Sequence, residues 1–157
     1  MIILVRGIFM IKRTIEPLLK KLAGLYPVVT VTGPRQSGKT TLCRKVFPHL
    51  TYVNLERPDT REFAISDPIG FLSGYPDGVI FDEIQRAPHL LSYIQVMVDE
   101  KGLPGRFILT GSQQLEVLNT ISQSLAGRTA LLKLLPFSMA ELGPDLLPPS
   151  QDNLLLT

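Results

Sequence analysis

The apolar residues of this chain follow two alternating spacings, one typical of strands and the other of helices. Short runs of mainly apolar residues, of which the first is rich in β-branched residues, predict strands at 27–32, 51–54, 79–81, 106–110 and 130–135. Apolar residues three and four positions apart predict helices at 12–25, 40–46, 89–98 and 115–125. Because strands and helices alternate along the chain, the pattern predicts a parallel sheet with right-handed helical crossovers.

Local composition refines this pattern at three places. The run at 27–32 lacks polar alternation, which predicts a central parallel strand that is covered on both faces. Pro17 stands early in the first helical segment, where the first turn of a helix tolerates it. Residues 56–78 are rich in Asp, Pro and Gly, so we expect loops and short helices there, one of them near 61–66.

Composition indicates a globular protein. The 157 residues are 45% hydrophobic and 19% charged, enough for one domain with its own core. The formal net charge of +2 gives no general reason to expect nucleic-acid binding, although it leaves a local basic patch open. The single cysteine, Cys43, excludes a disulfide framework and fits a cytoplasmic location, and we expect it to be a small buried residue.

The first ten residues are apolar, yet they do not predict a membrane segment. Arg6 and Gly7 interrupt the run, which is also too short to span a bilayer. A basic opening and a small-residue cleavage site, the marks of a signal peptide, are both missing from it. We therefore expect no membrane partner, and either Met1 or Met10 is the true start.

Residues 33–40 read Gly-Pro-Arg-Gln-Ser-Gly-Lys-Thr and match the phosphate-loop pattern at every fixed position. They lie between a predicted strand and a predicted helix, where backbone N–H groups and the helix N-terminus bind phosphate. Lys39 supplies a charge for the β- and γ-phosphates, and the Thr40 hydroxyl suits Mg²⁺. The alternative is an ordinary glycine turn. We expect the nucleotide-binding residues to be Gly33, Pro34, Arg35, Gln36, Ser37, Gly38, Lys39, Thr40 and Thr41.

Two adjacent carboxylates, Asp82 and Glu83, follow the apolar strand at 79–81. They stand at the strand end where ligands bind in open α/β sheets. In nucleotidases of this kind the first acid holds Mg²⁺, which assigns the metal to Asp82 together with Thr40. The second acid can polarise a water for attack on the γ-phosphate, which assigns the base to Glu83. The alternative is a solvated acidic turn.

Polar residues also follow the fourth predicted strand, at the same edge of the sheet. Thr110, Ser112 or Gln113 would hydrogen-bond the attacking water or the γ-phosphate, and Ser112 is our catalytic candidate among them. The alternative is that Gly111 and Ser112 open the next helix as its N-cap.

Arg128 falls between the last predicted helix and the last predicted strand. An arginine there can project toward the γ-phosphate of a neighbouring subunit, which would make the protein a homo-oligomer with Arg128 acting in trans. An ion pair with a carboxylate on its own surface is an equal alternative. The chain contains no Asn-Lys-x-Asp stretch for guanine, so we expect ATP.

Five motifs also occur together in the order found in a known family. They are Gly-Pro-Arg-Gln-Ser-Gly-Lys-Thr-Thr-Leu at 33–42, Tyr-Val-Asn-Leu-Glu at 52–56, Asp-Glu-Ile-Gln-Arg-Ala-Pro at 82–88, Leu-Thr-Gly-Ser-Gln at 109–113 and Leu-Ala-Gly-Arg at 125–128. Together they resemble the prokaryotic AAA-type ATPases described as ATP-binding proteins. Leu-Leu-Pro-Phe-Ser at 134–138 and Glu141 resemble the segment that follows the sheet in that family.

This resemblance implies a three-layer α/β/α P-loop NTPase fold of AAA+ type. Its parallel five-stranded sheet has the order 5-1-4-3-2, with the first strand between the fourth and the fifth. The resemblance supports Lys39 and Thr40 for nucleotide and metal, Asp82 for metal and Glu83 for water activation. It also implies a sensor-like role at the end of the fourth strand, and it makes Arg128 an arginine-finger candidate.

The resemblance also divides the chain. We expect an N-terminal extension at 1–11, the ATPase domain at 12–142, and a tail or the start of a truncated C-terminal region at 143–157. Members of the family continue into a helical C-terminal region, whereas this chain stops at Thr157. A truncated product or a fragment is therefore expected, in which the lid with its sensing arginine is missing and turnover and assembly are open.

We expect this domain to bind ATP with Mg²⁺ and to hydrolyse ATP slowly to ADP and phosphate. One alternative is a nucleotide-dependent switch without significant turnover, and another is an inactive truncated remnant. A small-molecule kinase would share the phosphate loop, but Glu83 next to Asp82 favours water as the acceptor. The work that the nucleotide drives is open, and the partner is an unknown protein or DNA.

Overall fold

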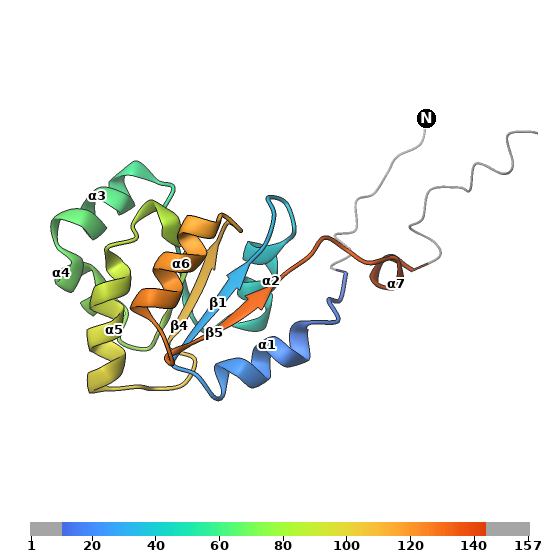
Figure 1. The fold of residues 1–157 in the computed structure, drawn as a ribbon, viewed down its shortest axis with the longest axis horizontal. Helices are drawn as coiled ribbons and strands as arrows, with labels where there is room; N and C mark the ends of the chain where they lie inside the picture. The colour runs from blue at the N-terminus through green and yellow to red at the C-terminus, as the bar shows by residue number, and fades with distance from the viewer. Residues whose placement is uncertain (1–10, 144–157) are drawn as a thin grey trace, which may run out of the picture.

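A computed structural model describes residues 11–143, and its centre is one parallel sheet (Figure 1). The strands are β1 (Val28–Thr32), β2 (Thr51–Asn54), β3 (Val79–Asp82), β4 (Phe107–Gly111) and β5 (Thr129–Lys133). Their order is β2-β3-β4-β1-β5, and every neighbouring pair is parallel. This order is the predicted 5-1-4-3-2 order counted from the other edge, so the AAA+ type of sheet is confirmed.

Helices cover both faces of the sheet. The helices are α1 (Glu16–Ala23), α2 (Lys39–Val46), α3 (Pro58–Ser66), α4 (Pro68–Ser73), α5 (Leu90–Glu100), α6 (Leu115–Ser124) and α7 (Met139–Leu142), with a 3₁₀ turn η1 (Ile84–Arg86). Buried residues of α1 and α2 pack on one face, whereas those of α3, α4, α5 and α6 pack on the other. The three-layer α/β/α architecture is therefore confirmed.

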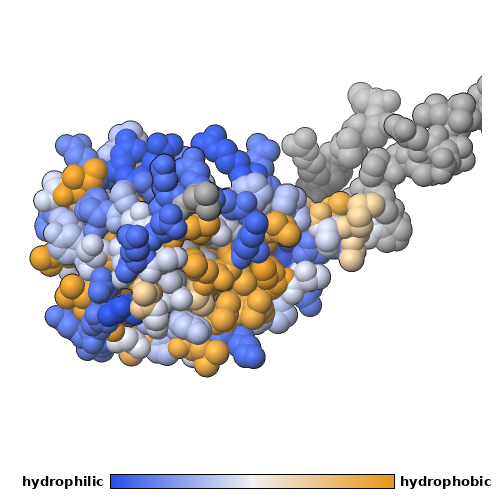
Figure 2. All heavy atoms as spheres, viewed as in Figure 1, coloured by the Kyte–Doolittle hydropathy of each residue, from blue (hydrophilic) through white to orange (hydrophobic). Residues whose placement is uncertain are grey.

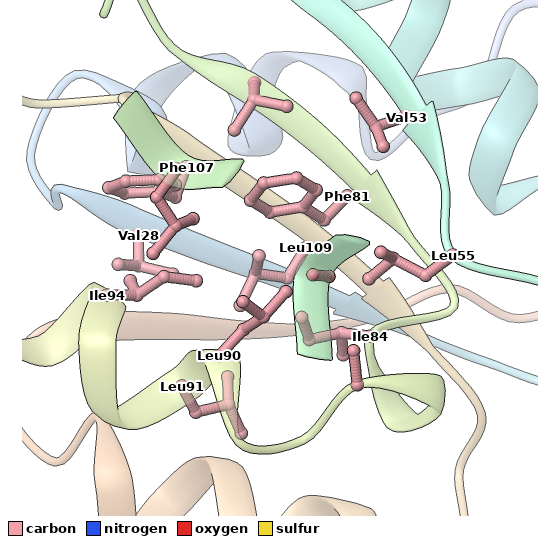
Figure 3. Close-up of a cluster of buried hydrophobic side chains, with 14 of the residues drawn as sticks. Val28, Val53, Leu55, Phe81, Ile84, Leu90, Leu91, Ile94, Phe107 and Leu109 are labelled. Atoms are coloured by element: carbon pink, nitrogen blue, oxygen red, sulfur yellow. The ribbon is translucent and has the colours of Figure 1, made fainter. Parts of the chain in front are cut away.

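Alternation along the central strand β1 divides the core into two clusters. Val28 belongs to the cluster under α3 to α6, whereas Val29 and Val31 belong to the cluster under α1 and α2. In the first cluster the Phe81 ring stacks on Phe107, with ring centroids 6.4 Å apart (Figure 3). Both rings are fully buried, and burial of one such side chain contributes roughly 1.5–3 kcal/mol. These rings fix β3 and β4 against each other, and the same two strands carry the polar residues Asp82 and Thr110 at their ends.

The observed helices differ from the predicted ones mainly at their ends. The first helix occupies Glu16–Ala23 rather than 12–25, because the chain before it packs against the phosphate loop instead of continuing the helix. Pro17 does lie in its first turn, as predicted. In the region 56–78 there are two short helices, and the second begins where the Asp67 carboxylate accepts a hydrogen bond from Gly70 N (3.0 Å). That cap, followed directly by proline, is a helix-start signal that the sequence did contain.

The edge strand β5 carries the most apolar part of the visible surface. Figure 2 shows apolar side chains gathered over β5 and the neighbouring α1. Leu131 and Leu18 are each nearly half exposed. Within residues 11–143, no helix combines the length and the hydrophobicity needed to cross a bilayer. Residues 1–10 of the predicted extension at 1–11, and residues 144–157 of the predicted tail, lie outside the described residues.

Candidate functional site

The phosphate-loop sequence forms the turn between β1 and α2, and close packing requires its first glycine. A Cβ atom on Gly33 would lie 2.3 Å from the Leu134 carbonyl oxygen and 2.9 Å from Ser37 Oγ. Gly38, with φ of +88°, and Gln36, with φ of +60°, both adopt the left-handed conformation that the turn needs. The loop therefore ends at the N-terminus of α2, the end of a helix that favours bound anions.

Lys39 is the first residue of α2 and is only 7% exposed. Its ammonium donates hydrogen bonds to the carbonyl oxygens of Gly33 (3.0 Å) and Pro34 (2.9 Å). An ammonium has three N–H donors, so two of them hold the loop closed and the third remains for an anionic ligand. The position is the one that the predicted phosphate-binding role requires, and that role stays a prediction.

The Asp82 carboxylate, at the end of β3, accepts hydrogen bonds from hydroxyl groups on three different elements. Thr40 Oγ1 lies 2.9 Å and 3.0 Å from its two carboxylate oxygens, and Tyr52 OH donates to Oδ2 at 2.7 Å. Thr110 Oγ1 donates to Oδ1. Because Asp82 is 6% exposed, these donors replace the water that its charge would otherwise bind. The structure therefore brings together Thr40 and Asp82, the two residues predicted to hold the metal.

Glu83, the predicted base, adopts an unusual backbone conformation. Its φ of +60° and ψ of +52° are left-handed, which a non-glycine residue adopts mainly at turns and functional sites. Its backbone N–H donates to Thr110 Oγ1 (3.1 Å), so one hydroxyl joins the ends of β3 and β4. Its half-buried carboxylate accepts a hydrogen bond from Gln85 Nε2.

A cavity of about 230 Å³ opens between the loop and Glu83. Its lining residues are Arg35, Gln36, Gly38, Lys39, Thr40, Thr41 and Glu83. Except for Glu83, all of these residues belong to the predicted nucleotide-binding set. The predicted phosphate-binding residues and the predicted base therefore share one cavity.

The polar residues at and after the end of β4 differ in their surroundings. Thr110 joins the site through Asp82 and Glu83, whereas Ser112 Oγ and Gln113 Nε2 are buried without a hydrogen-bond partner among the described residues. The alternative that Ser112 caps α6 is wrong, because Gln114 occupies the N-cap. The catalytic role of Ser112 stays a prediction.

Arg128 lies away from this cavity. It directly precedes β5, whereas Asp82 is the last residue of β3 and the loop follows β1, so Arg128 stands at the opposite end of the parallel strands. Its guanidinium donates to both carboxylate oxygens of Asp99, at 2.5 Å and 2.9 Å. This contact is the surface ion pair that the sequence left as the alternative. A role in trans for Arg128 stays a prediction.

Tyr52 is the site residue that sequence reasoning missed. Burial and its hydrogen bond to the Asp82 carboxylate raise the pKa of the Tyr52 hydroxyl, which therefore remains a donor at neutral pH. The signal in the sequence was the Tyr-Val-Asn-Leu-Glu motif at 52–56, on a strand that the expected order places beside the third strand, and in the structure Tyr52 aligns with Ile80 of β3. Cys43 is fully buried, as predicted, and burial together with the nearby charge of Asp82 raises the pKa of its thiol to about 12.

A parallel sheet with a glycine loop before α2, and with a contact between Thr40 and the buried Asp82 at the same strand ends, defines a P-loop nucleotide-binding domain. A family described as "AAA domain" matches residues 25–143. The chain belongs to this family, which is a family of nucleotide-binding domains.

A mycobacterial protein is similar to most of this chain. Mb2031c of Mycobacterium bovis, an uncharacterized protein, is 39% identical over 120 residues, which are 74% of this chain and 27% of that protein. The chain thus spans about a quarter of that relative.

Solved structures show the same fold. The Walker-type ATPase PABY2304 of Pyrococcus abyssi has a TM-score of 0.56 at 18% identity, covering 84% of this chain and 55% of its own. PCH-2 of C. elegans has a TM-score of 0.56 at 15% identity, covering 79% of this chain and 42% of its own. At such identities the likeness concerns the fold alone.

Proposed function

We propose that this domain binds ATP with Mg²⁺ and hydrolyses it slowly to ADP and phosphate. The observation that carries the proposal is the contact between Thr40 Oγ1 and the Asp82 carboxylate, at 2.9 Å and 3.0 Å, beside the cavity of the phosphate loop. A hydroxyl and a carboxylate from two different elements form the pair of oxygen ligands that a nucleotide-bound Mg²⁺ takes from a protein.

The candidate residues in and around the cavity divide the work of this proposal. Lys39 and the loop hold the β- and γ-phosphates, and Thr40 with Asp82 holds Mg²⁺, whose charge offsets that of the phosphates. Glu83 orients and polarises a water for in-line attack on the γ-phosphate, and Ser112 stabilises that water or the γ-phosphate. Catalysis in this scheme is positioning and charge stabilisation rather than covalent chemistry.

The first test is equilibrium binding of a fluorescent ATP analogue with Mg²⁺, comparing wild type with Lys39→Ala. We expect the variant to lose at least tenfold in affinity, because a charge-assisted contact to phosphate is removed. Lys21→Ala is the matched control, since Lys21 is exposed on α1. Equal affinity in wild type and Lys39→Ala would refute the proposed phosphate site.

Phosphate release separates the enzyme from the alternative of a nucleotide switch. In an enzyme, Glu83→Gln abolishes turnover and preserves ATP binding, because the amide keeps the shape of the carboxylate but is a poor base. In a switch, Glu83→Gln leaves both the binding and the ATP-dependent conformational response unchanged, and wild type releases no phosphate above background. In an inactive remnant, the folded wild-type chain binds no ATP.

Assembly, partner and location complete the proposal. In a homo-oligomer, Arg128 would leave Asp99 and contact the γ-phosphate of a neighbouring subunit, so Arg128→Ala should slow phosphate release without weakening ATP binding. An unchanged release rate in an ATP-dependent oligomer would contradict this.

The buried, unpaired Cys43 supports a cytoplasmic location, which cell fractionation tests. The partner is a protein or DNA, to be identified by cross-linking in the presence of ATP.

A further inference from the structure

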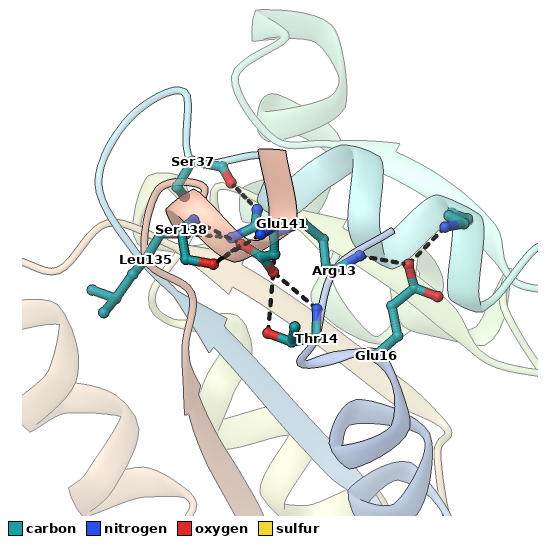
Figure 4. A network of polar contacts seen from close by, with 8 residues as sticks. Arg13, Thr14, Glu16, Ser37, Leu135, Ser138 and Glu141 are labelled. Carbon is teal, nitrogen blue, oxygen red and sulfur yellow. Dashed lines mark hydrogen bonds and ion pairs between the residues drawn. The ribbon is translucent and has the colours of Figure 1, made fainter. Parts of the chain in front are cut away.

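Arg13 is a buried arginine that the phosphate-binding scheme leaves without a role. It lies before α1, is 6% exposed, and its guanidinium is aimed at the phosphate loop (Figure 4). Nη1 donates to the Ser37 carbonyl oxygen at 2.7 Å, and Nη2 donates to the Leu135 carbonyl oxygen at 2.5 Å. Nε donates to Glu141 Oε1 at 3.1 Å. One side chain thus joins three segments that are far apart in the sequence.

Glu141, which accepts the hydrogen bond from Arg13 Nε, is itself held by further hydrogen bonds. Glu141 accepts hydrogen bonds from Thr14 N (2.9 Å) and Ser138 N (2.9 Å), and Ser138 Oγ accepts from Glu141 N to complete a capping box at α7. The Arg13 guanidinium also lies over the Phe137 ring, 4.3 Å from its centroid. Residues 135–142, after the last strand, are therefore fixed to the loop through Arg13.

The geometry points to Arg13 as a positioning residue that sets the phosphate loop and couples nucleotide binding to residues 135–142. This inference rests on the proposed ATP site. It goes beyond that site, because Arg13 and Glu141 are not among the residues that line the cavity.

The physical link is the peptide bond between Ser37 and Gly38. In a planar trans peptide the C=O and the following N–H point in opposite directions, so a donor that fixes the Ser37 carbonyl also fixes the Gly38 N–H. Gly38 lines the cavity, whereas its Cα lies next to Arg13: an added Cβ would be 3.5 Å from Nη1. Arg13 therefore holds the carbonyl on its own side, which orients the Gly38 N–H away from itself for an anion.

Coupling of this kind acts in both directions. If the contacts between Arg13 and residues 135–142 favour the loop conformation that binds phosphate, bound phosphate must favour those contacts by the same factor. Nucleotide should therefore slow hydrogen exchange at the amides of Ser138 and Glu141, which take part in the capping box. A residue with a structural role alone would not transmit such a response.

The test combines ATP affinity with hydrogen exchange in the full 157-residue chain, using the fluorescent ATP analogue with Mg²⁺. We expect Arg13→Gln to weaken binding about tenfold, the change expected when a hydrogen bond from a charged group is lost. In wild type, the analogue should slow exchange in the peptide covering 135–142. In Arg13→Gln this response should be absent, even when the analogue saturates the site.

Two further variants control for folding and for charge. Arg13→Lys keeps the charge and the aliphatic stem, but one ammonium cannot reproduce a fork that reaches three acceptors, so it should still lose the exchange response. It decides the question if thermal unfolding shows that Arg13→Gln does not fold. Lys12→Gln removes a charge from the adjacent exposed residue and should match wild type in both measurements.

Each outcome has a distinct meaning. Folded Arg13 variants that keep wild-type affinity within twofold, together with the exchange response, would overturn the coupling and leave the ATP site intact. A folded wild-type chain that does not bind the analogue would overturn both the ATP site and the coupling. Loss of the response in Arg13→Lys but not in Lys12→Gln would support the inference.

Discussion

Replacement of Gly33 by alanine should damage the phosphate loop through a contact far along the chain. The new Cβ would lie 2.3 Å from the Leu134 carbonyl oxygen, about 1 Å closer than ordinary van der Waals contact allows. Leu134 N in turn donates to Thr32 O at 2.7 Å, so the segment after β5 cannot easily move away. Gly33 does not have a positive φ, so the substitution tests the clash alone.

The expected cost follows from this overlap. Extra atoms forced into a packed site typically cost 1–3 kcal/mol, and we expect about 2 kcal/mol for Gly33→Ala. For a domain of this size, that corresponds to a fall in melting temperature of roughly 4–8 °C. Because relief of the clash must displace the loop, ATP-analogue affinity should fall as well. Thermal unfolding with circular dichroism and equilibrium binding measure the two effects.

Gly24→Ala is the matched control. Gly24 has right-handed backbone angles at the end of α1, and an added Cβ would have only ordinary contacts, the nearest at 3.4 Å from the Lys21 carbonyl oxygen. We expect it to leave both properties unchanged or to raise stability slightly. The reasoning is refuted if Gly33→Ala melts within about 1 °C of wild type and binds the analogue equally well.

Two further predictions concern the polar contacts. Tyr52→Phe removes the 2.7 Å hydrogen bond to Asp82, which should lower the free energy of unfolding by about 1–2 kcal/mol in urea titrations and weaken the Mg²⁺ dependence of ATP binding. The control, Tyr93→Phe, alters a 38% exposed tyrosine, and equal losses in the two variants would contradict the prediction. Burial of Glu141 opposes ionisation, but donors from Ser138, Thr14 and Arg13 outweigh it and lower the pKa from 4.5 to about 2. Its contribution to stability is therefore complete above pH 4.5 and lost as the pH falls toward 2, so Glu141→Gln should reduce the loss of stability between pH 5 and 3, and identical pH profiles would show this to be wrong.

The sheet could be predicted from the sequence because its strands are buried on both faces. Strand β1 is an uninterrupted buried run, so its apolar residues mark it without any need for alternation. Helix ends were harder to predict, because they depend on contacts with distant residues. Nothing in the helical spacing of residues 12–25 indicates that Arg13 turns toward the phosphate loop, and this contact accompanies a start of α1 only at Glu16.

The residues of the candidate site likewise divide into those that the sequence indicates and those that only the fold brings to the site. Asp82 and Thr40 were paired in advance because a motif gives one residue and the end of a buried strand gives the other. Tyr52 was missed even though the expected strand order places the second strand beside the third, because no motif indicates that its hydroxyl reaches Asp82. For Arg128 the sequence left two alternatives open, and its pairing with Asp99 is a contact between α5 and the start of β5 that no local pattern encodes.

The phosphate loop of this domain is held from outside at two points, one made by Leu134 after β5 and the other by Arg13 before α1. The Leu134 carbonyl lies against Gly33, and Arg13 joins Ser37 to Leu135 and Glu141. In the proposed site residues 33–40 would supply the donors for phosphate, whereas Arg13 and the residues after β5 would fix the direction in which those donors point. A change in residues 134–141 should act on nucleotide affinity without touching the nucleotide. By the proposed coupling, the same contacts would transmit the effect of bound nucleotide to residues 135–142.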